Sequence, residues 1–181
     1  MRIREIFDTQ VEEKIDPVVK VAERQDETKL AAEIGSYVVT PTIEKHLDDF
    51  LEHYTDTFHL PTSEIGVWIS GYFGSGKSYL AKISALLAEN PSLIGVSAAD
   101  RFLARVPSHA PHRASIQRSL SRLNQCDTQL IGFNINTAAD DKTTPLPHVL
   151  LSQYYQAKGY SSNFIYARVI EAELDKMGLL P

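Results

Sequence analysis

Cysteine is nearly absent from this sequence: Cys126 is the single one among 181 residues, so an internal disulfide is excluded. A small disulfide-stabilised secreted scaffold is excluded with it. No apolar run approaches the ~18 residues that a membrane-spanning helix needs. The start, MRIREIFDTQ, carries too much charge for a signal peptide. We therefore expect a cytoplasmic protein without a membrane segment.

A strong net charge is also lacking, because 18 Lys and Arg residues stand against 23 Asp and Glu residues and leave a formal charge of −5. Attraction of the whole chain to nucleic acid is not expected. Positive charge gathers instead in residues 100–122, which hold five arginines and one aspartate. Three interpretations stay open: a solvated helix face, a surface for phosphate or nucleic acid, or a subunit contact. The candidate contact residues are Arg113, Arg118 and Arg122.

Several catalytic signatures are missing from the sequence. No G-x-S-x-G nucleophile elbow occurs, and neither does the Asn-Lys-x-Asp box of guanine-specific proteins. His109 and His112 have no third ligand, so the histidines form no metal-binding pattern with Cys126. The four apolar residues and Asp that position Mg²⁺ in many ATPases are absent as well. Asp140 and Asp141 are expected to lie in a solvated loop.

One strong motif is present. Residues 71–78, Gly-Tyr-Phe-Gly-Ser-Gly-Lys-Ser, match G-x-x-x-x-G-K-[ST] at every fixed position. Glycines let the backbone approach phosphates closely, and amides at a helix start bind them with a favourable dipole. The motif's Lys reaches the β and γ phosphates and its hydroxyl completes a Mg²⁺ shell, so ATP and Mg²⁺ are the expected cofactors. The predicted nucleotide-binding residues are Gly71, Gly74, Ser75, Gly76, Lys77, Ser78 and Tyr79, with Lys77 catalytic and Ser78 the Mg²⁺ ligand.

The apolar pattern predicts both helices and strands. Helices are expected after Asp26, with Gly35 as the stop, and over 41–58, Lys77–Glu89, Arg113–Asn124, 148–158 and Asn163–Gly178. Strands are expected over Val18–Val21, Ile65–Ser70 and Leu130–Ile135, with Trp68 in the core and Tyr37–Thr40 extended. This alternation predicts an α/β P-loop fold in which helices flank a parallel sheet. We expect a lead-in over residues 1–60 and an incomplete nucleotide-binding core over residues 61–181, truncated before its acidic Mg²⁺-positioning strand.

Several segments resemble one family. Arg4–Phe7, Tyr37–Thr40 and above all Gly66–Ser78 are similar to the N-terminal part of the BrxC/PglY family, the large P-loop ATPases of BREX bacteriophage-exclusion systems. The likeness covers most of residues 1–90. It implies an AAA+-like ATPase that assembles with other BREX or Pgl defence proteins. The chain departs at Tyr72 and Tyr79, where members tend to have Phe and His, and members continue far beyond 181 residues.

Motif and resemblance together predict ATP·Mg²⁺ binding within a large antiviral defence ATPase, with little or no turnover by this chain alone. A homo-oligomer and a weak, salt-sensitive DNA contact stay open as further partners. Two alternative functions also stay open. One is a small P-loop phosphotransferase whose Arg-rich segment closes as a lid. The other is a non-catalytic assembly or DNA-binding module.

Overall fold

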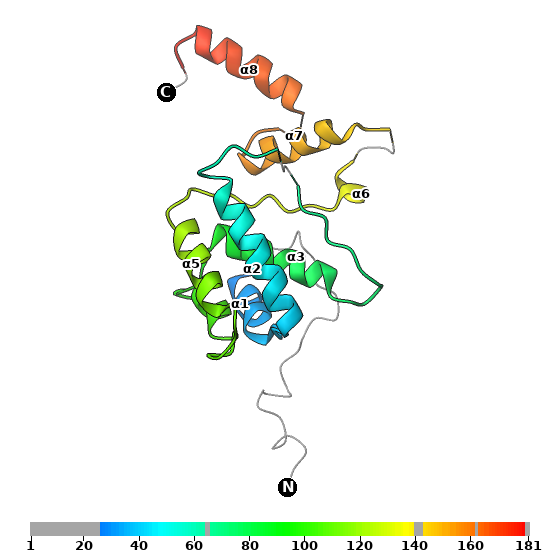
Figure 1. The fold of residues 1–181 in the computed structure, drawn as a ribbon. Helices are drawn as coiled ribbons and strands as arrows, with labels where there is room; N and C mark the ends of the chain where they lie inside the picture. Colours follow the sequence, from blue (N-terminus) through cyan, green and yellow to red (C-terminus); the bar gives the residue numbers. More distant parts are fainter. Residues whose placement is uncertain (1–25, 64–65, 140–142, 162, 180–181) are drawn as a thin grey trace. The chain divides into compact units, whose positions relative to one another are not determined.

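The computed structural model describes residues 26–63, 66–139, 143–161 and 163–179. These residues are mainly helical and form two compact units that divide after Thr128 (Figure 1). The first unit contains α1 (Glu27–Ser36), α2 (Pro41–Asp56), α3 (Lys77–Glu89), β1 (Ser92–Leu93), β2 (Val96–Ser97), α4 (Ala98–Leu103) and α5 (Arg113–Leu123). The second unit contains α6 (Ile135–Ala138), α7 (Leu146–Ala157) and α8 (Phe164–Lys176). The boundary expected at residue 60 falls between α2 and α3, which both contribute to the core of the first unit.

The first two helices begin at the capping residues that the sequence predicts. The Asp26 carboxylate accepts a hydrogen bond from the Lys29 N–H at 3.1 Å and so caps α1. The Thr40 hydroxyl accepts one from the Ile43 N–H at 3.3 Å, and Pro41 occupies the first position of α2, where no N–H is needed. The predicted stop at Gly35 is one residue early, because α1 continues to Ser36.

The core of the first unit consists of apolar side chains from its helices and from β1. Its most buried large members are Leu30, Ile34, Leu47, Leu51, Ile83, Leu86, Leu87, Leu93, Phe102, Ile116, Leu120 and Leu123. On α3 and α5 they recur at spacings of three and four residues, which confirms the predicted helical stripes. α3 has the predicted bounds, and α5 packs along α2 (Figure 1).

The predicted α/β fold with a parallel sheet is wrong. Within the described ranges there is one small antiparallel sheet, in which β1 and β2 pair Ser92 with Ser97 and Leu93 with Val96. Ile94 and Gly95 join the two strands with φ angles of +48° and +74°, as a two-residue hairpin turn requires. This hairpin leads into α4 rather than serving as the support of a nucleotide-binding loop.

The apolar runs that were predicted to be buried strands do not form strands. Residues 66–70 and 130–134 belong to no strand, and Ile135 already begins α6. A strand must satisfy its backbone N–H and C=O groups on neighbouring strands, and the interior of the first unit is filled by helices instead. The expected strand over Val18–Val21 lies outside the described residues.

The described residues of the second unit form three helices. α7 begins two residues before the predicted start and ends one residue before the predicted end, and α8 lies within the predicted range. Val149 on α7 and Ala167 on α8 are buried. Across the described part of the chain, none of the helices combines the length and the apolar character that crossing a bilayer demands.

Candidate functional site

The glycine-rich segment, residues 71–76, is an exposed turn that leads directly into α3. The Ser75 N–H donates to the Tyr72 carbonyl oxygen at 3.2 Å and closes the turn. Gly74 and Gly76 have φ angles of +78° and +83°, which residues with a Cβ rarely adopt. At Gly71 an added Cβ would lie 2.8 Å from the Ser75 hydroxyl oxygen. The turn therefore depends on glycine at Gly74 and Gly76, and of these two positions the motif specifies Gly76.

The N-terminus of α3 presents main-chain amides at the end of this turn. Gly76 precedes the helix without a side-chain cap, and the first helical hydrogen bond runs from the Leu80 N–H to the Gly76 carbonyl at 2.9 Å. The amides of residues 77–79 come before that bond, so they have no acceptor within the helix. Together with the helix dipole, these donors form a suitable surface for an anion.

Lys77 and Ser78 occupy the first turn of α3. The Lys77 ammonium folds back over the loop and donates to the Tyr72 carbonyl oxygen at 2.6 Å. Its positive charge therefore lies on the loop side of the helix, where a phosphate oxygen could replace the carbonyl as acceptor. Ser78 is exposed, so its hydroxyl is accessible to a hydrated cation.

The Tyr79 side chain packs toward α1 and Tyr37, and its predicted role in nucleotide binding stays a prediction. Its hydroxyl donates to the Glu33 carbonyl oxygen on α1 and lies 3.2 Å from the Ser36 hydroxyl. Its ring packs edge-on against Tyr37, with 4.7 Å between centroids. Burial, reinforced by the neighbouring Tyr79, raises the pKa of Tyr37 to about 12.

A cavity of about 140 Å³ adjoins the loop. Its lining comes from the loop and its lead-in (Ile69, Ser70, Ser75 and Gly76), from the first turn of α3 (Lys77, Tyr79 and Leu80), and from Tyr37 and Ile43. The cavity thus connects the start of α3 with an apolar and aromatic surface. Sequence reasoning did not identify the lining that Tyr37 and Ile43 supply, because these residues come 34 and 28 residues before Gly71 and reach the loop only through folding.

A buried ion pair lies between α1 and α3, and sequence reasoning missed it. Lys82 is 1% exposed, and its ammonium lies 2.7 Å from the Glu33 carboxylate. Within the described residues, neither charged group has a further hydrogen-bond partner. The sequence did offer one indication that Lys82 is buried. It lies three residues after Tyr79 and directly before Ile83, which is on the inward face of α3. Since Glu33 also accepts from Tyr79, α1 holds the first two turns of α3 at two points.

The lead-in to the loop is exposed instead of forming the predicted strand. Trp68, which was expected in the core, is 91% exposed, and Phe73 at the tip of the loop is fully exposed. The backbone of residues 66–70 belongs to no strand or helix. Of the strand, loop and helix that were expected around the motif, the loop and the helix are present, but residues 66–70 form no strand. Asp140 and Asp141, expected in a solvated loop, lie outside the described residues.

The predicted contact arginines are largely engaged within the first unit. The Arg113 guanidinium donates to the carbonyl oxygens of Leu103 and Val106. Arg122 forms an ion pair with Asp56 on α2 at 3.0 Å. Arg118, by contrast, is exposed on α5. Of the three residues, Arg118 is the one whose location suits a contact with another molecule.

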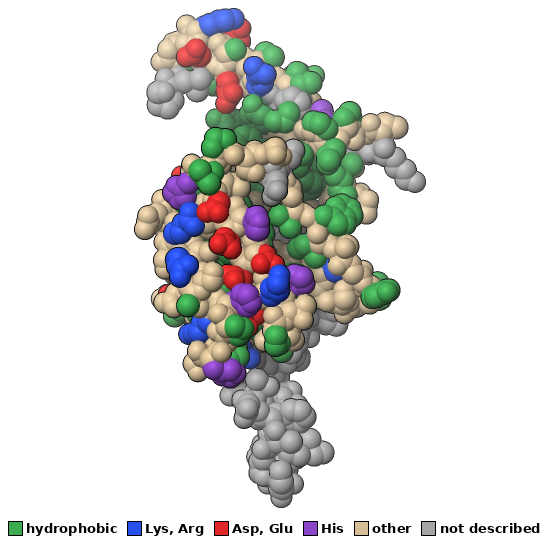
Figure 2. Space-filling view, in the orientation of Figure 1, with side chains coloured by type: hydrophobic (Ala, Val, Ile, Leu, Met, Phe, Trp, Pro, Cys, Tyr) green, Lys and Arg blue, Asp and Glu red, His purple; other side chains and the backbone are tan. Residues whose placement is uncertain are grey.

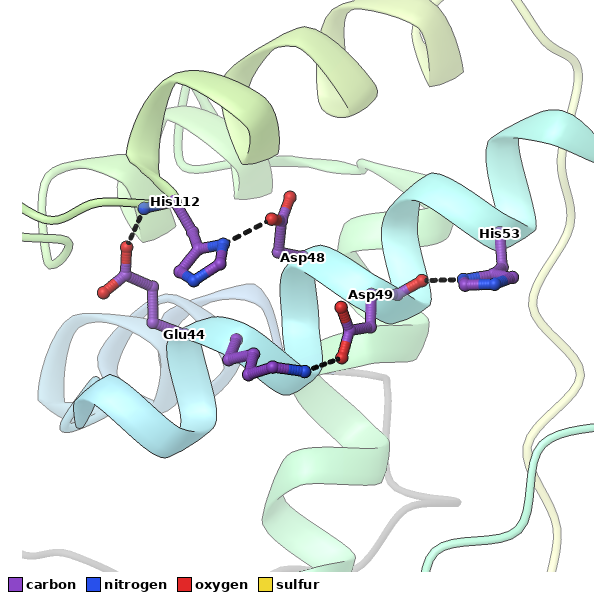
Figure 3. A network of polar contacts seen from close by, with 6 residues as sticks. Glu44, Asp48, Asp49, His53 and His112 are labelled. Atoms are coloured by element: carbon purple, nitrogen blue, oxygen red, sulfur yellow. Dashed lines mark hydrogen bonds and ion pairs between the residues drawn. The ribbon is translucent and has the colours of Figure 1, made fainter.

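His112 joins α2 to α5 (Figure 3). Its main-chain N–H donates to the buried Glu44 carboxylate at 2.6 Å, and its Nδ1 lies 2.6 Å from a carboxylate oxygen of the buried Asp48. His53 contacts the Asp49 carbonyl on the exposed side of α2. Across the described ranges, no group of three His, Cys, Asp or Glu residues is arranged to hold a metal ion. The contacts of His112 with Glu44 and Asp48 link the start of α5 to α2.

The face of the first unit seen in Figure 2 carries acidic, basic and histidine side chains intermixed. This face has no extended patch of one charge sign. No protein-family model matches the chain, and no solved structure matches it.

Proposed function

We propose that residues 71–78 bind the phosphates of ATP together with Mg²⁺. The observation that carries this proposal is the glycine turn with positive φ angles at Gly74 and Gly76, which delivers three unpaired helix amides and the Lys77 ammonium to one place. In this arrangement the amides of α3 hold the phosphate oxygens. Lys77 neutralises the β and γ phosphates, and the Ser78 hydroxyl ligates Mg²⁺.

We further propose that this binding serves a large ATPase of BREX bacteriophage defence, acting with other BREX or Pgl proteins. The supporting observation is the similarity of Tyr37–Thr40 and Gly66–Ser78 to the corresponding segments of that family. In such an ATPase, Lys77 stabilises the charge that develops on the γ phosphate when water attacks it. This chain alone binds ATP with little or no turnover.

Calorimetry with Mg·ATP tests the binding proposal. Lys77→Ala removes a charge-assisted hydrogen bond and should weaken binding by about 10- to 100-fold. Lys45→Ala is the matched control, because Lys45 is a lysine on the exposed side of α2 and should leave the affinity unchanged. If Lys77→Ala bound ATP as tightly as the parent, the loop would be structural, in agreement with the non-catalytic alternative.

The defence role is tested separately in cells that contain a complete BREX system. Lys77→Ala, introduced into the full-length ATPase that contains this chain, should abolish phage exclusion while the protein still co-purifies with its partners. Retained phage exclusion by this variant would contradict a role for nucleotide binding in defence.

A further inference from the structure

The cavity beside the loop has the size of one ring system. Its volume of about 140 Å³ is close to the ~150 Å³ of an engineered apolar cavity that takes up benzene. Pockets that enclose a whole drug-sized ligand are larger, at roughly 300–1,000 Å³. The cavity, which is partly open to solvent, can therefore receive one flat portion of a larger ligand whose remaining part lies outside it.

The lining outside the loop and Lys77 is formed by rings and branched aliphatic side chains. Tyr37 and Tyr79 pack edge to face there, and Ile43 and Leu80 complete the surface. The Tyr79 hydroxyl is already engaged by the Glu33 carbonyl and by Ser36. The polar lining side chains Ser70, Ser75 and Lys77 belong to the loop, its lead-in and the first residue of α3. Apart from the Tyr37 hydroxyl, these four residues thus offer packing to a flat ring and little to distinguish the polar edge of one ring from another.

We infer that this cavity holds the base of a nucleoside triphosphate and recognises it as a flat ring, so that purine and pyrimidine nucleotides bind with similar affinity. The inference rests on the proposed phosphate binding at residues 71–78. Gly76 and Lys77 belong both to the cavity lining and to the phosphate surface at the start of α3. One ligand can therefore place its phosphates on the amides of α3 and its ring against Tyr37.

The test compares Mg²⁺ complexes of ATP, GTP, CTP and inorganic tripolyphosphate by calorimetry on the unmodified chain. The three nucleotides should bind within about threefold of one another. Tripolyphosphate should bind at least about tenfold more weakly, because it lacks the packing of a base on aromatic rings. Equal affinity of tripolyphosphate and ATP, or a preference above tenfold for one base, would overturn the inference. If neither tripolyphosphate nor any nucleotide bound, the proposed phosphate site itself would be refuted.

Two variants add independent readouts. Tyr37→Phe keeps the ring and removes the hydroxyl. An equal effect on the three nucleotides would support the inference, whereas selective loss of one nucleotide would show that the hydroxyl reads a base edge and would overturn it. Ile43→Trp fills the cavity and should lower nucleotide affinity to that of tripolyphosphate without affecting tripolyphosphate itself. Circular dichroism verifies that this variant folds. Should it fail to fold, the comparison of ligands on the unmodified chain still decides the matter.

Discussion

Replacing Lys82 by Met tests whether the buried ion pair with Glu33 holds α1 against α3. Lys82 is almost inaccessible, and its ammonium lies 2.7 Å from the Glu33 carboxylate. Its removal leaves that carboxylate without a partner in a site closed to water, at a cost of about 3–5 kcal/mol in the free energy of unfolding. With a urea m-value of about 2 kcal/mol per M, the unfolding midpoint should fall by about 2 M.

Urea unfolding followed by circular dichroism measures this change, and hydrogen exchange of the α1 amides localises it. Lys45→Met is the matched control, because Lys45 pairs with Asp49 on an exposed face and its loss should leave the midpoint unchanged. The double variant Glu33→Leu/Lys82→Met removes both buried charges and should recover most of the lost stability. A single variant as stable as the parent, or a double variant no more stable than the single one, would refute this reasoning.

Three further predictions address other parts of the first unit. Trp68→Ala should leave the urea midpoint unchanged, because the indole lies outside the core. A decrease of more than about 1 kcal/mol in the free energy of unfolding would contradict the exposure of Trp68. Stability should fall as the pH rises from 10 to about 12, because the unfolded Tyr37 ionises first while burial keeps the folded one protonated; urea midpoints for Tyr37→Phe should fall less over this range. DNA binding through Arg118 should weaken steeply with salt; unchanged anisotropy titrations for Arg118→Glu would exclude that surface.

Local sequence signals predicted the helices well. The capping side chains of Asp26 and Thr40 start α1 and α2, and the spacing of apolar residues gives α3 its observed bounds. A cap or an apolar stripe acts over three or four residues along one helix, so its effect can be identified without knowledge of the rest of the chain. The turn at Gly74 and Gly76 is predictable for the same reason, because its φ angles require glycine.

Strands and buried charges were not predictable in this way. The apolar run containing Trp68 has the composition of a buried strand, but whether it is buried and paired depends on segments remote in sequence. Arg113 has the charge of a phosphate contact, yet the fold places its guanidinium on the carbonyls of Leu103 and Val106. Fewer positive charges of residues 100–122 are therefore available to a partner than the composition of this segment indicates.

The amino-acid sequence by itself determined the glycine turn, the lysine that follows it, and the helices whose caps and periodicity are local. Tertiary structure alone decided that helices fill the core, that Lys82 is neutralised by Glu33, and that Tyr37 and Ile43 form a wall beside the loop. The physical reason is the separation along the sequence of the groups that interact. A helix satisfies its hydrogen bonds within itself, whereas a sheet, a buried ion pair and a cavity each require partners from distant segments.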